Sequence, residues 1–181
     1  MDRLSALVLL GLIGLLSAQQ RESRSVNVPL VLVTAKPDHL EIRRGKDLGV
    51  TMTITAGLKG AYLPNFFGDW VATCQAGFSV EIVKLGGGTA STAEKGCAID
   101  SLEPGRPANE LLSEYVLLKP GESRSWHTTL TKIVKSPGEY RIEGEYFSAN
   151  ERIRAVAALP EVHGLMVIGH VQAAPVMVRI R

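Results

Sequence analysis

The sequence has little of several residue types and motifs, and each shortage excludes a class of function. There are only two cysteines in 181 residues, and the spacing of Cys74 and Cys97 matches neither a Cys-x-x-Cys nor a zinc-site pattern. The sequence lacks the Gly-x-Ser-x-Gly motif of serine hydrolases. The glycines at 86–88 are not followed by the Lys-Ser/Thr pair of a phosphate-binding loop. Basic residues are scattered rather than gathered in a stripe, which argues against nucleic-acid binding. We therefore expect a protein that is not an enzyme and binds no cofactor or nucleic acid.

The histidines and acidic residues do not define a site by their spacing. The 18 acidic residues leave a carboxylate pair of the glycoside-hydrolase kind open, but no spacing singles one out. Two histidines lie seven residues apart in a loop-rich segment, which matches no metal-ligand template. We therefore expect no metal site, and surface or hydrogen-bonded roles for the four histidines. These are His39, His127, His163 and His170.

The chain has no apolar run long enough for a membrane span, which needs about 20 residues. Its N-terminal apolar run, Leu4 to Leu16, follows a charged start and precedes Ser17 and Ala18, a pattern typical of a secretory signal peptide. We expect cleavage after residue 18, a disordered lead-in over 19–27 and one β-sandwich domain over 28–181. The mature protein is then secreted or periplasmic and has no stable membrane span. The alternative is an uncleaved anchor.

Secretion bears on the two cysteines, because cysteine pairs are usually oxidised outside the cytoplasm. A disulfide between Cys74 and Cys97 would close a loop of 97 − 74 = 23 residues and stabilise the fold by roughly 3 kcal/mol. The glycine tract at 86–88 lies inside that loop. We expect this disulfide, with a redox or metal-binding thiol pair as the weaker alternative.

Alternation of apolar and polar residues predicts β-strands. In the segment 50–55, Val50, Met52 and Ile54 are expected to face the core while the threonines face outward. We expect a loop over 89–110, a short helix over 151–159 and an extra strand over 164–169. The sequence thus predicts an all-β, antiparallel β-sandwich with a long insertion before the last strand. Further strands are expected at 28–34, 40–42, 78–85, 115–118, 125–130, 140–147 and 174–180.

Two Pro-Gly turns carry a resemblance to known families. Leu118-Lys119-Pro120-Gly121-Glu122-Ser123 and Pro137-Gly138-Glu139-Tyr140 resemble secreted bacterial immunoglobulin-like sandwich domains and the all-β fold of BsuPI-type proteinase inhibitors. The resemblance implies an immunoglobulin-like sandwich. The chain departs from antibody-type domains because Trp70 precedes both cysteines, whereas those domains place their tryptophan between them. No inter-sheet disulfide and no functional residue carries over.

Aromatic residues make up only 6% of the chain, yet four of them gather between positions 62 and 70. Such residues either fill a core or form a contact surface, and the nearby Pro64, Asn65 and Gly68 indicate a loop. The sequence predicts a secreted, non-catalytic module for protein binding or cell-envelope structure, with an unknown protein or glycan as partner. A proteinase inhibitor with an exposed loop in 74–97 and a carbohydrate-binding module are the alternatives. The candidate binding residues are Tyr62, Phe66, Phe67 and Trp70.

Overall fold

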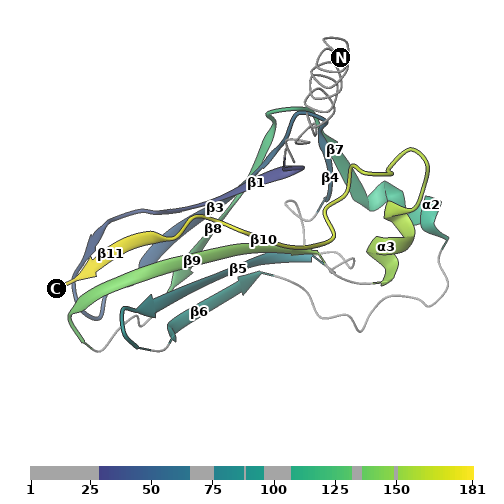
Figure 1. Cartoon of the computed structure of the whole chain (residues 1–181). Helices are drawn as coiled ribbons and strands as arrows, with labels where there is room; N and C mark the ends of the chain where they lie inside the picture. Colours follow the sequence, from purple (N-terminus) through teal and green to yellow (C-terminus); the bar gives the residue numbers. More distant parts are fainter. Residues whose placement is uncertain (1–28, 66–75, 88, 96–106, 132–135, 149–150) are drawn as a thin grey trace, which may run out of the picture.

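The computed structural model describes residues 29–65, 76–87, 89–95, 107–131, 136–148 and 151–181. These residues form two main sheets packed face to face (Figure 1). The three-stranded sheet has the order β1-β3-β8, and the six-stranded sheet has the order β2-β11-β9-β5-β6, with β10 paired to β9. The strands are β1 (Val31–Pro37), β2 (Glu41–Ile42), β3 (Leu48–Ala56), β5 (Ala76–Lys84), β6 (Thr89–Lys95), β8 (Ser123–Leu130), β9 (Gly138–Ser148), β10 (Gly169–Gln172) and β11 (Val176–Ile180).

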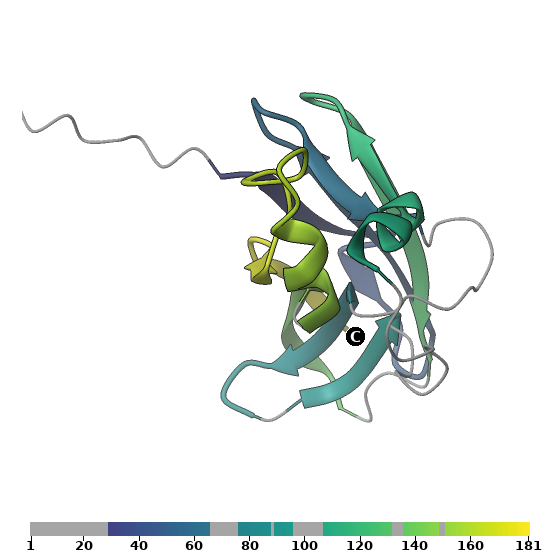
Figure 2. The same ribbon diagram turned by 90° about the vertical axis from the view of Figure 1, so that its right-hand side faces the viewer.

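One end of the sandwich is closed by smaller elements. A two-stranded ribbon joins β4 (Ala61–Pro64) to β7 (Tyr115–Leu118). The short helices are α2 (Ala108–Leu111), the 3₁₀ turn η2 (Leu112–Glu114) and α3 (Glu151–Ala157). Figure 2 looks toward the end that carries α2 and α3. No helix in the described ranges is long and apolar enough to cross a membrane.

The prediction of an all-β sandwich is confirmed, and so is the insertion before the last strand, which contains α3 and β10. The expected strands at 50–55, 78–85, 140–147 and 174–180 correspond to β3, β5, β9 and β11. Among the strands named above, pairing is antiparallel except between β11 and β2, which run parallel. The signal peptide, the lead-in and both cysteines lie outside the described residues, so these expectations stay predictions.

The predictions for 89–95 and for 164–168 are wrong. Residues 89–110 were expected to be a loop, but 89–95 form β6, which pairs with β5 across a turn containing Gly86 at φ 74°. β5 supplies the backbone hydrogen-bond partners of β6, and this pairing outweighs the weak strand preference of the small polar residues in β6. The extra strand expected at 164–169 begins only at Gly169, while Met166 makes a single parallel bridge to Tyr62.

The outer face of the three-stranded sheet is a ladder of hydroxyl side chains, as the alternation of 50–55 predicted. The hydroxyls of Thr53 and Ser125 lie 2.8 Å apart, and those of Thr55 and Ser123 also lie 2.8 Å apart. Cross-strand pairs of this kind each stabilise a sheet by about 0.2–1 kcal/mol. The opposite face of β3, carrying Met52 and Ile54, is fully buried.

The two sheets make a close contact at Gly144, on the buried face of β9. A Cβ atom at this position would lie 2.6 Å from Met52 Cε and 3.2 Å from Ala35 Cβ, both on the opposing sheet. Those distances are shorter than van der Waals contact, so a side chain at 144 would push the sheets apart or displace Met52. Glycine within a strand commonly marks such a close approach.

Aromatic rings join the sheets beside this contact. Phe78 of β5 stacks on Trp126 of β8 with ring centroids 5.9 Å apart and planes at 9°. Tyr146 of β9 meets Phe78 edge-on at 5.6 Å. Burial raises the pKa of Tyr146, and burial together with the Glu114 carboxylate raises the pKa of Tyr115 to about 12.

The packing at Gly144 predicts a coupling with Met52. Gly144→Val should cost about 1–3 kcal/mol because it overfills the core, and Met52→Ala about 2–5 kcal/mol because it leaves a cavity. The double variant should cost at least about 1 kcal/mol less than the sum, since the space left by Met52 accepts the valine. Urea unfolding of the four proteins measures this coupling. Additive costs would show that the two residues do not share one space.

The raised pKa of Tyr115 predicts a loss of stability at high pH. Between its ordinary pKa of 10.0 and about 12, the folded chain keeps the phenolic proton that the unfolded chain has lost. Fewer protons are bound in the unfolded state, so the free energy of unfolding falls as pH rises. Urea unfolding at pH 8 and at pH 11 should show a smaller loss for Tyr115→Phe than for the wild type, by about 1 kcal/mol. Equal losses in the two proteins would contradict this assignment.

Candidate functional site

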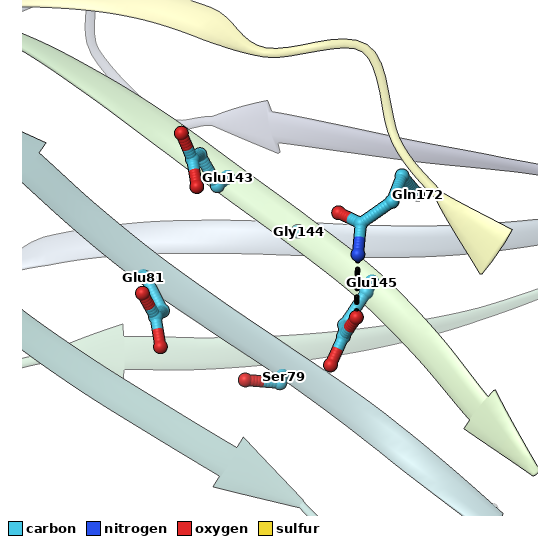
Figure 3. Close-up of a pocket in the computed structure, with 6 residues that line it drawn as sticks. All are labelled: Ser79, Glu81, Glu143, Gly144, Glu145 and Gln172. Carbon is cyan, nitrogen blue, oxygen red and sulfur yellow. Dashed lines mark hydrogen bonds between the residues drawn. The ribbon is translucent and has the colours of Figure 1, made fainter. Parts of the chain in front are cut away.

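An acidic hollow lies on the outer face of the six-stranded sheet, where β5, β9 and β10 run side by side. Phe78 of β5 and Tyr146 of β9 are buried in the core. The residues next to them along each strand therefore face outward. The hollow has a volume of about 190 Å³ (Figure 3). We call it the acidic hollow throughout. It is lined by Ser79, Glu81, Glu143, Gly144, Glu145 and Gln172.

Strand register brings the lining residues together from distant parts of the chain. Glu81 of β5 stands directly opposite Glu143 of β9, and Ser79 stands opposite Glu145. On the other side of β9, Gln172 of β10 also stands opposite Glu145. Because β9 is paired on both sides, its outward side chains are held by rigid backbone, which suits a binding site.

Hydrogen bonds orient Glu145 at one side of the acidic hollow. Gln172 donates from Nε2 to Glu145 Oε2 at 2.5 Å, and His170 Nδ1 lies 3.2 Å from the same oxygen. The Glu145 side chain is 26% exposed, so these contacts are partly shielded from water. Glu145 is therefore a fixed wall of the hollow.

The opposed pair Glu81 and Glu143 is electrostatically unfavourable by itself. Like charges directly across an antiparallel pair destabilise a sheet. Arg141, the next outward residue on β9, forms an ion pair with Glu143 and relieves part of this repulsion. The six lining residues still contain three glutamates and no lysine or arginine. A positive group entering the hollow would therefore be attracted by all three carboxylates.

Ser79 is the polar residue at the base of the acidic hollow. It is only 8% exposed, although it lies on the outward side of β5. Its short side chain lies among the longer glutamates, and Figure 3 shows it between Glu81 and Glu145. Its hydroxyl is one of the polar groups that line the acidic hollow.

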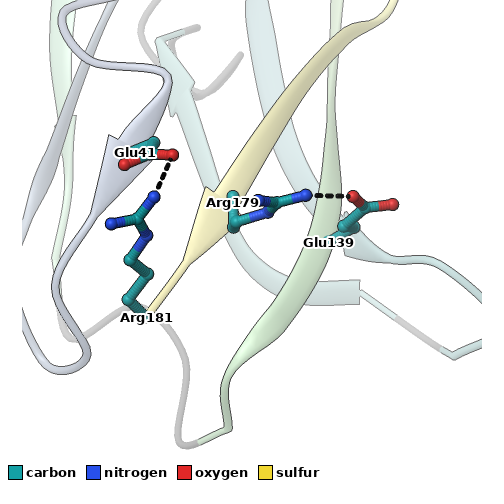
Figure 4. A network of polar contacts seen from close by, with 4 residues as sticks. All are labelled: Glu41, Glu139, Arg179 and Arg181. Carbon is teal, nitrogen blue, oxygen red and sulfur yellow. Dashed lines mark hydrogen bonds and ion pairs between the residues drawn. The ribbon is translucent and has the colours of Figure 1, made fainter.

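A second surface hollow, at the other end of the same sheet, has a different electrostatic character. It has a volume of about 290 Å³ and includes Leu40 and Met177. Its carboxylates are matched by guanidinium groups: Arg179 donates to Glu139 at 3.0 Å (Figure 4). Arg181 likewise donates to Glu41 at 2.6 Å. These charges neutralise one another within the protein, whereas the lining of the acidic hollow contains three glutamates and no lysine or arginine.

The structure places the residues predicted from sequence as follows. Tyr62 lies in β4, half-buried against the core, and Pro64 is buried in the same strand. The loop that Pro64, Asn65 and Gly68 indicated is therefore wrong at Pro64, because β4 pairs with β7 up to this residue. Phe66, Phe67 and Trp70 lie outside the described residues, and their role in binding stays a prediction. No group of three His, Cys, Asp or Glu side chains that could hold a metal ion occurs among the residues the structure describes.

Sequence reasoning missed the residues of the acidic hollow. The alternation in 78–85 and 140–147 does place Glu81, Glu143 and Glu145 on outward positions. What it could not provide is the register of β5 against β9, which makes two of these glutamates neighbours.

Comparison with known proteins gives no family assignment. No protein-family model and no curated protein matches the chain. Among solved structures, the chain is 8% identical to the alkylpurine DNA glycosylase AlkC of Pseudomonas fluorescens, with a TM-score of 0.42, covering 84% of this chain and 30% of that one. A CARDB domain of a Pyrococcus furiosus protein is 14% identical, with a TM-score of 0.39 and coverage of 86% and 96%. The sporulation control protein Spo0M of Bacillus subtilis is 10% identical, with a TM-score of 0.37, and the match covers 85% of this chain and 50% of that one. None of these similarities is close enough to carry an argument about function.

Proposed function

We propose that this protein is a secreted or periplasmic, non-catalytic β-sandwich module that binds a protein partner through the acidic hollow. The observation that supports the proposal best is the register of β5 against β9, which sets Glu81 opposite Glu143. This register gathers carboxylates on one exposed face of the sheet, and a local concentration of negative charge attracts a positively charged partner.

The setting of the acidic hollow suits recognition of a positively charged protein surface. Glu143 and Glu145 are 36% and 26% exposed, respectively, so a partner can reach both carboxylates. Clusters of one charge sign accelerate encounter with an oppositely charged partner and select against like-charged ones. The non-catalytic part of the proposal comes from the sequence, which has no recognised nucleophile motif.

The two alternative functions depend on other residues. A proteinase inhibitor would use the 74–97 loop, and a carbohydrate-binding module would use the four aromatic residues from Tyr62 to Trp70. Most of residues 74–97 are described, and they form the antiparallel hairpin of β5 and β6. Of the four aromatic residues only Tyr62 is described, and it packs partly against the core. No described contact favours either alternative over the acidic hollow.

The proposal is tested by quantitative capture from periplasmic and culture-medium extracts of the source organism. Immobilised wild type is compared with the double variant Glu81→Gln/Glu143→Gln, which keeps the shape of both side chains but removes their charge. The control is Glu139→Gln, which removes a carboxylate from the same sheet outside the hollow. We expect a protein captured by wild type and control, with capture reduced at least about tenfold by the double variant, since close interfacial charge pairs couple by about 1.5–7 kcal/mol.

Salt gives a second readout of the same interaction. In about 1 M salt, where the Debye length falls to about 3 Å, capture by the wild type should also fall. Equal capture by all three proteins, or no specific capture at all, would contradict the proposal.

A further inference from the structure

Two hairpin turns lie side by side at one end of the sandwich, away from the C-terminus (Figure 1, Figure 2). The turn between β3 and β4 is closed by the N–H of Gly60, which donates to the carbonyl oxygen of Gly57 at 3.0 Å. The turn between β7 and β8 is closed in the same way, at 2.9 Å, by the N–H of Glu122 and the carbonyl oxygen of Lys119. We call residues 57–60, 117 and 119–122 together the turn end.

Backbone hydrogen bonds hold the two turns together. The N–H of Gly121 donates to the carbonyl oxygen of Ala56, and the N–H of Ala56 donates to the carbonyl oxygen of Glu122, both at 2.9 Å. A Cβ atom at Gly60 would lie 3.6 Å from Leu117 Cδ1, so the side chain of Leu117 lies against the first turn. The backbone positions that carry the side chains of the turn end are therefore fixed relative to one another.

The turn end exposes leucines and lysines together. Leu58 is 77% exposed and Leu117 is 44% exposed. Lys59 and Lys119 are exposed as well, and neither has an ion-pair partner among the residues that the structure describes. Apolar side chains gain free energy when they leave water, and basic side chains near them are attracted to anionic lipid headgroups. Leucines flanked by lysines therefore suit a lipid surface.

The net charge of the two turns is positive. Residues 57–60 and 119–122 contain two lysines and one acidic residue, Glu122. The Glu122 carboxylate is used within its own turn, where Oε2 accepts a hydrogen bond from the N–H of Lys119 at 2.7 Å. The charge of the turn end is therefore complementary to an anionic surface.

The N-terminal residues join the described structure at the turn end. A Cβ atom at Gly57 would lie 2.4 Å from the carbonyl oxygen of Pro29. The 28 residues before Pro29 include the apolar run 4–16, and residues 19–28 carry two arginines and one glutamate. With or without the apolar run, a net positive segment is thus attached beside the two turns, and an anionic membrane that attracts this segment meets the turn end.

The opposite end of the sandwich lacks this attachment. It also exposes apolar side chains, among them Leu40 and Leu85, and the basic turn 43–46. Leu40 lines the second surface hollow, where Arg179 is paired with Glu139. The position of the N-terminal segment therefore distinguishes the two ends.

We propose that the turn end rests on the surface of an anionic phospholipid membrane, with Leu58 and Leu117 entering the acyl boundary and Lys59 and Lys119 contacting headgroup phosphates. This inference uses no residue of the acidic hollow and does not depend on the proposed function. The turns belong to the three-stranded sheet and the β4-β7 ribbon, so the outer face of the six-stranded sheet stays open to a partner.

Tryptophan fluorescence tests the position of the turn end, because brominated acyl chains quench only an indole that reaches them. The full chain is used as it is produced, with vesicles of equal parts phosphatidylglycerol and brominated phosphatidylcholine. Leu58→Trp places an indole at the turn end, and Leu85→Trp places one at the opposite end, where Leu85 is 47% exposed. The parent chain gives the background from Trp70 and Trp126. We expect the added indole to be quenched in Leu58→Trp and not in Leu85→Trp.

The charge requirement is measured in the Leu58→Trp protein. Adding Lys59→Gln and Lys119→Gln should raise the lipid concentration for half-maximal quenching at least about fivefold, because each basic residue near an anionic surface strengthens binding by about that factor. Adding Arg43→Gln and Lys46→Gln removes the same charge from the opposite end and should change this concentration less than about twofold.

Two results would overturn the inference. One is quenching that is absent from, or equal in, Leu58→Trp and Leu85→Trp. The other is an equal effect of the two charge-removing pairs. All the substituted side chains are exposed, so urea unfolding should show the midpoint of the parent for every variant and establish that each one is folded.

Discussion

The structure depends on the close contact of its two sheets at Gly144. Because this position lacks a side chain, Met52 and Ala35 of the opposing sheet can approach the backbone of β9. Gly144 lies on the buried face of β9 together with Ile142 and Tyr146. Strand residues alternate between faces, so Glu143 and Glu145, on either side of Gly144, must both face outward. The packing of the core thereby determines where the carboxylates of the acidic hollow lie.

The two ends of the six-stranded sheet use similar residues for different purposes. Near the end of the chain, Arg179 and Arg181 neutralise Glu139 and Glu41, and exposed pairs of this kind contribute little to stability. In the acidic hollow the carboxylates outnumber the cations, and a nearly buried hydroxyl lies among them. The proposed function rests on this local excess of carboxylates, because clustered charge of one sign attracts a partner of the opposite sign.

The strands of the core could be predicted from the sequence, because burial on one face imposes a regular alternation. Val50, Met52 and Ile54 face inward as expected, and their threonine neighbours form the outer ladder. The strand β6 could not be predicted, since its small polar residues have no apolar pattern and depend on pairing with β5. The acidic hollow was missed for a related reason. Alternation assigns Glu81 and Glu143 to a face, but only the long-range register makes them opposite one another.

The central proposal is that a positively charged protein partner binds at the acidic hollow. A crystal structure of the protein in complex with the captured partner tests it most directly. The account predicts a lysine or arginine nitrogen of the partner within about 2.7–3.2 Å of a carboxylate oxygen of Glu143 or Glu145. A partner bound at another surface, with the acidic hollow open to solvent, would contradict it.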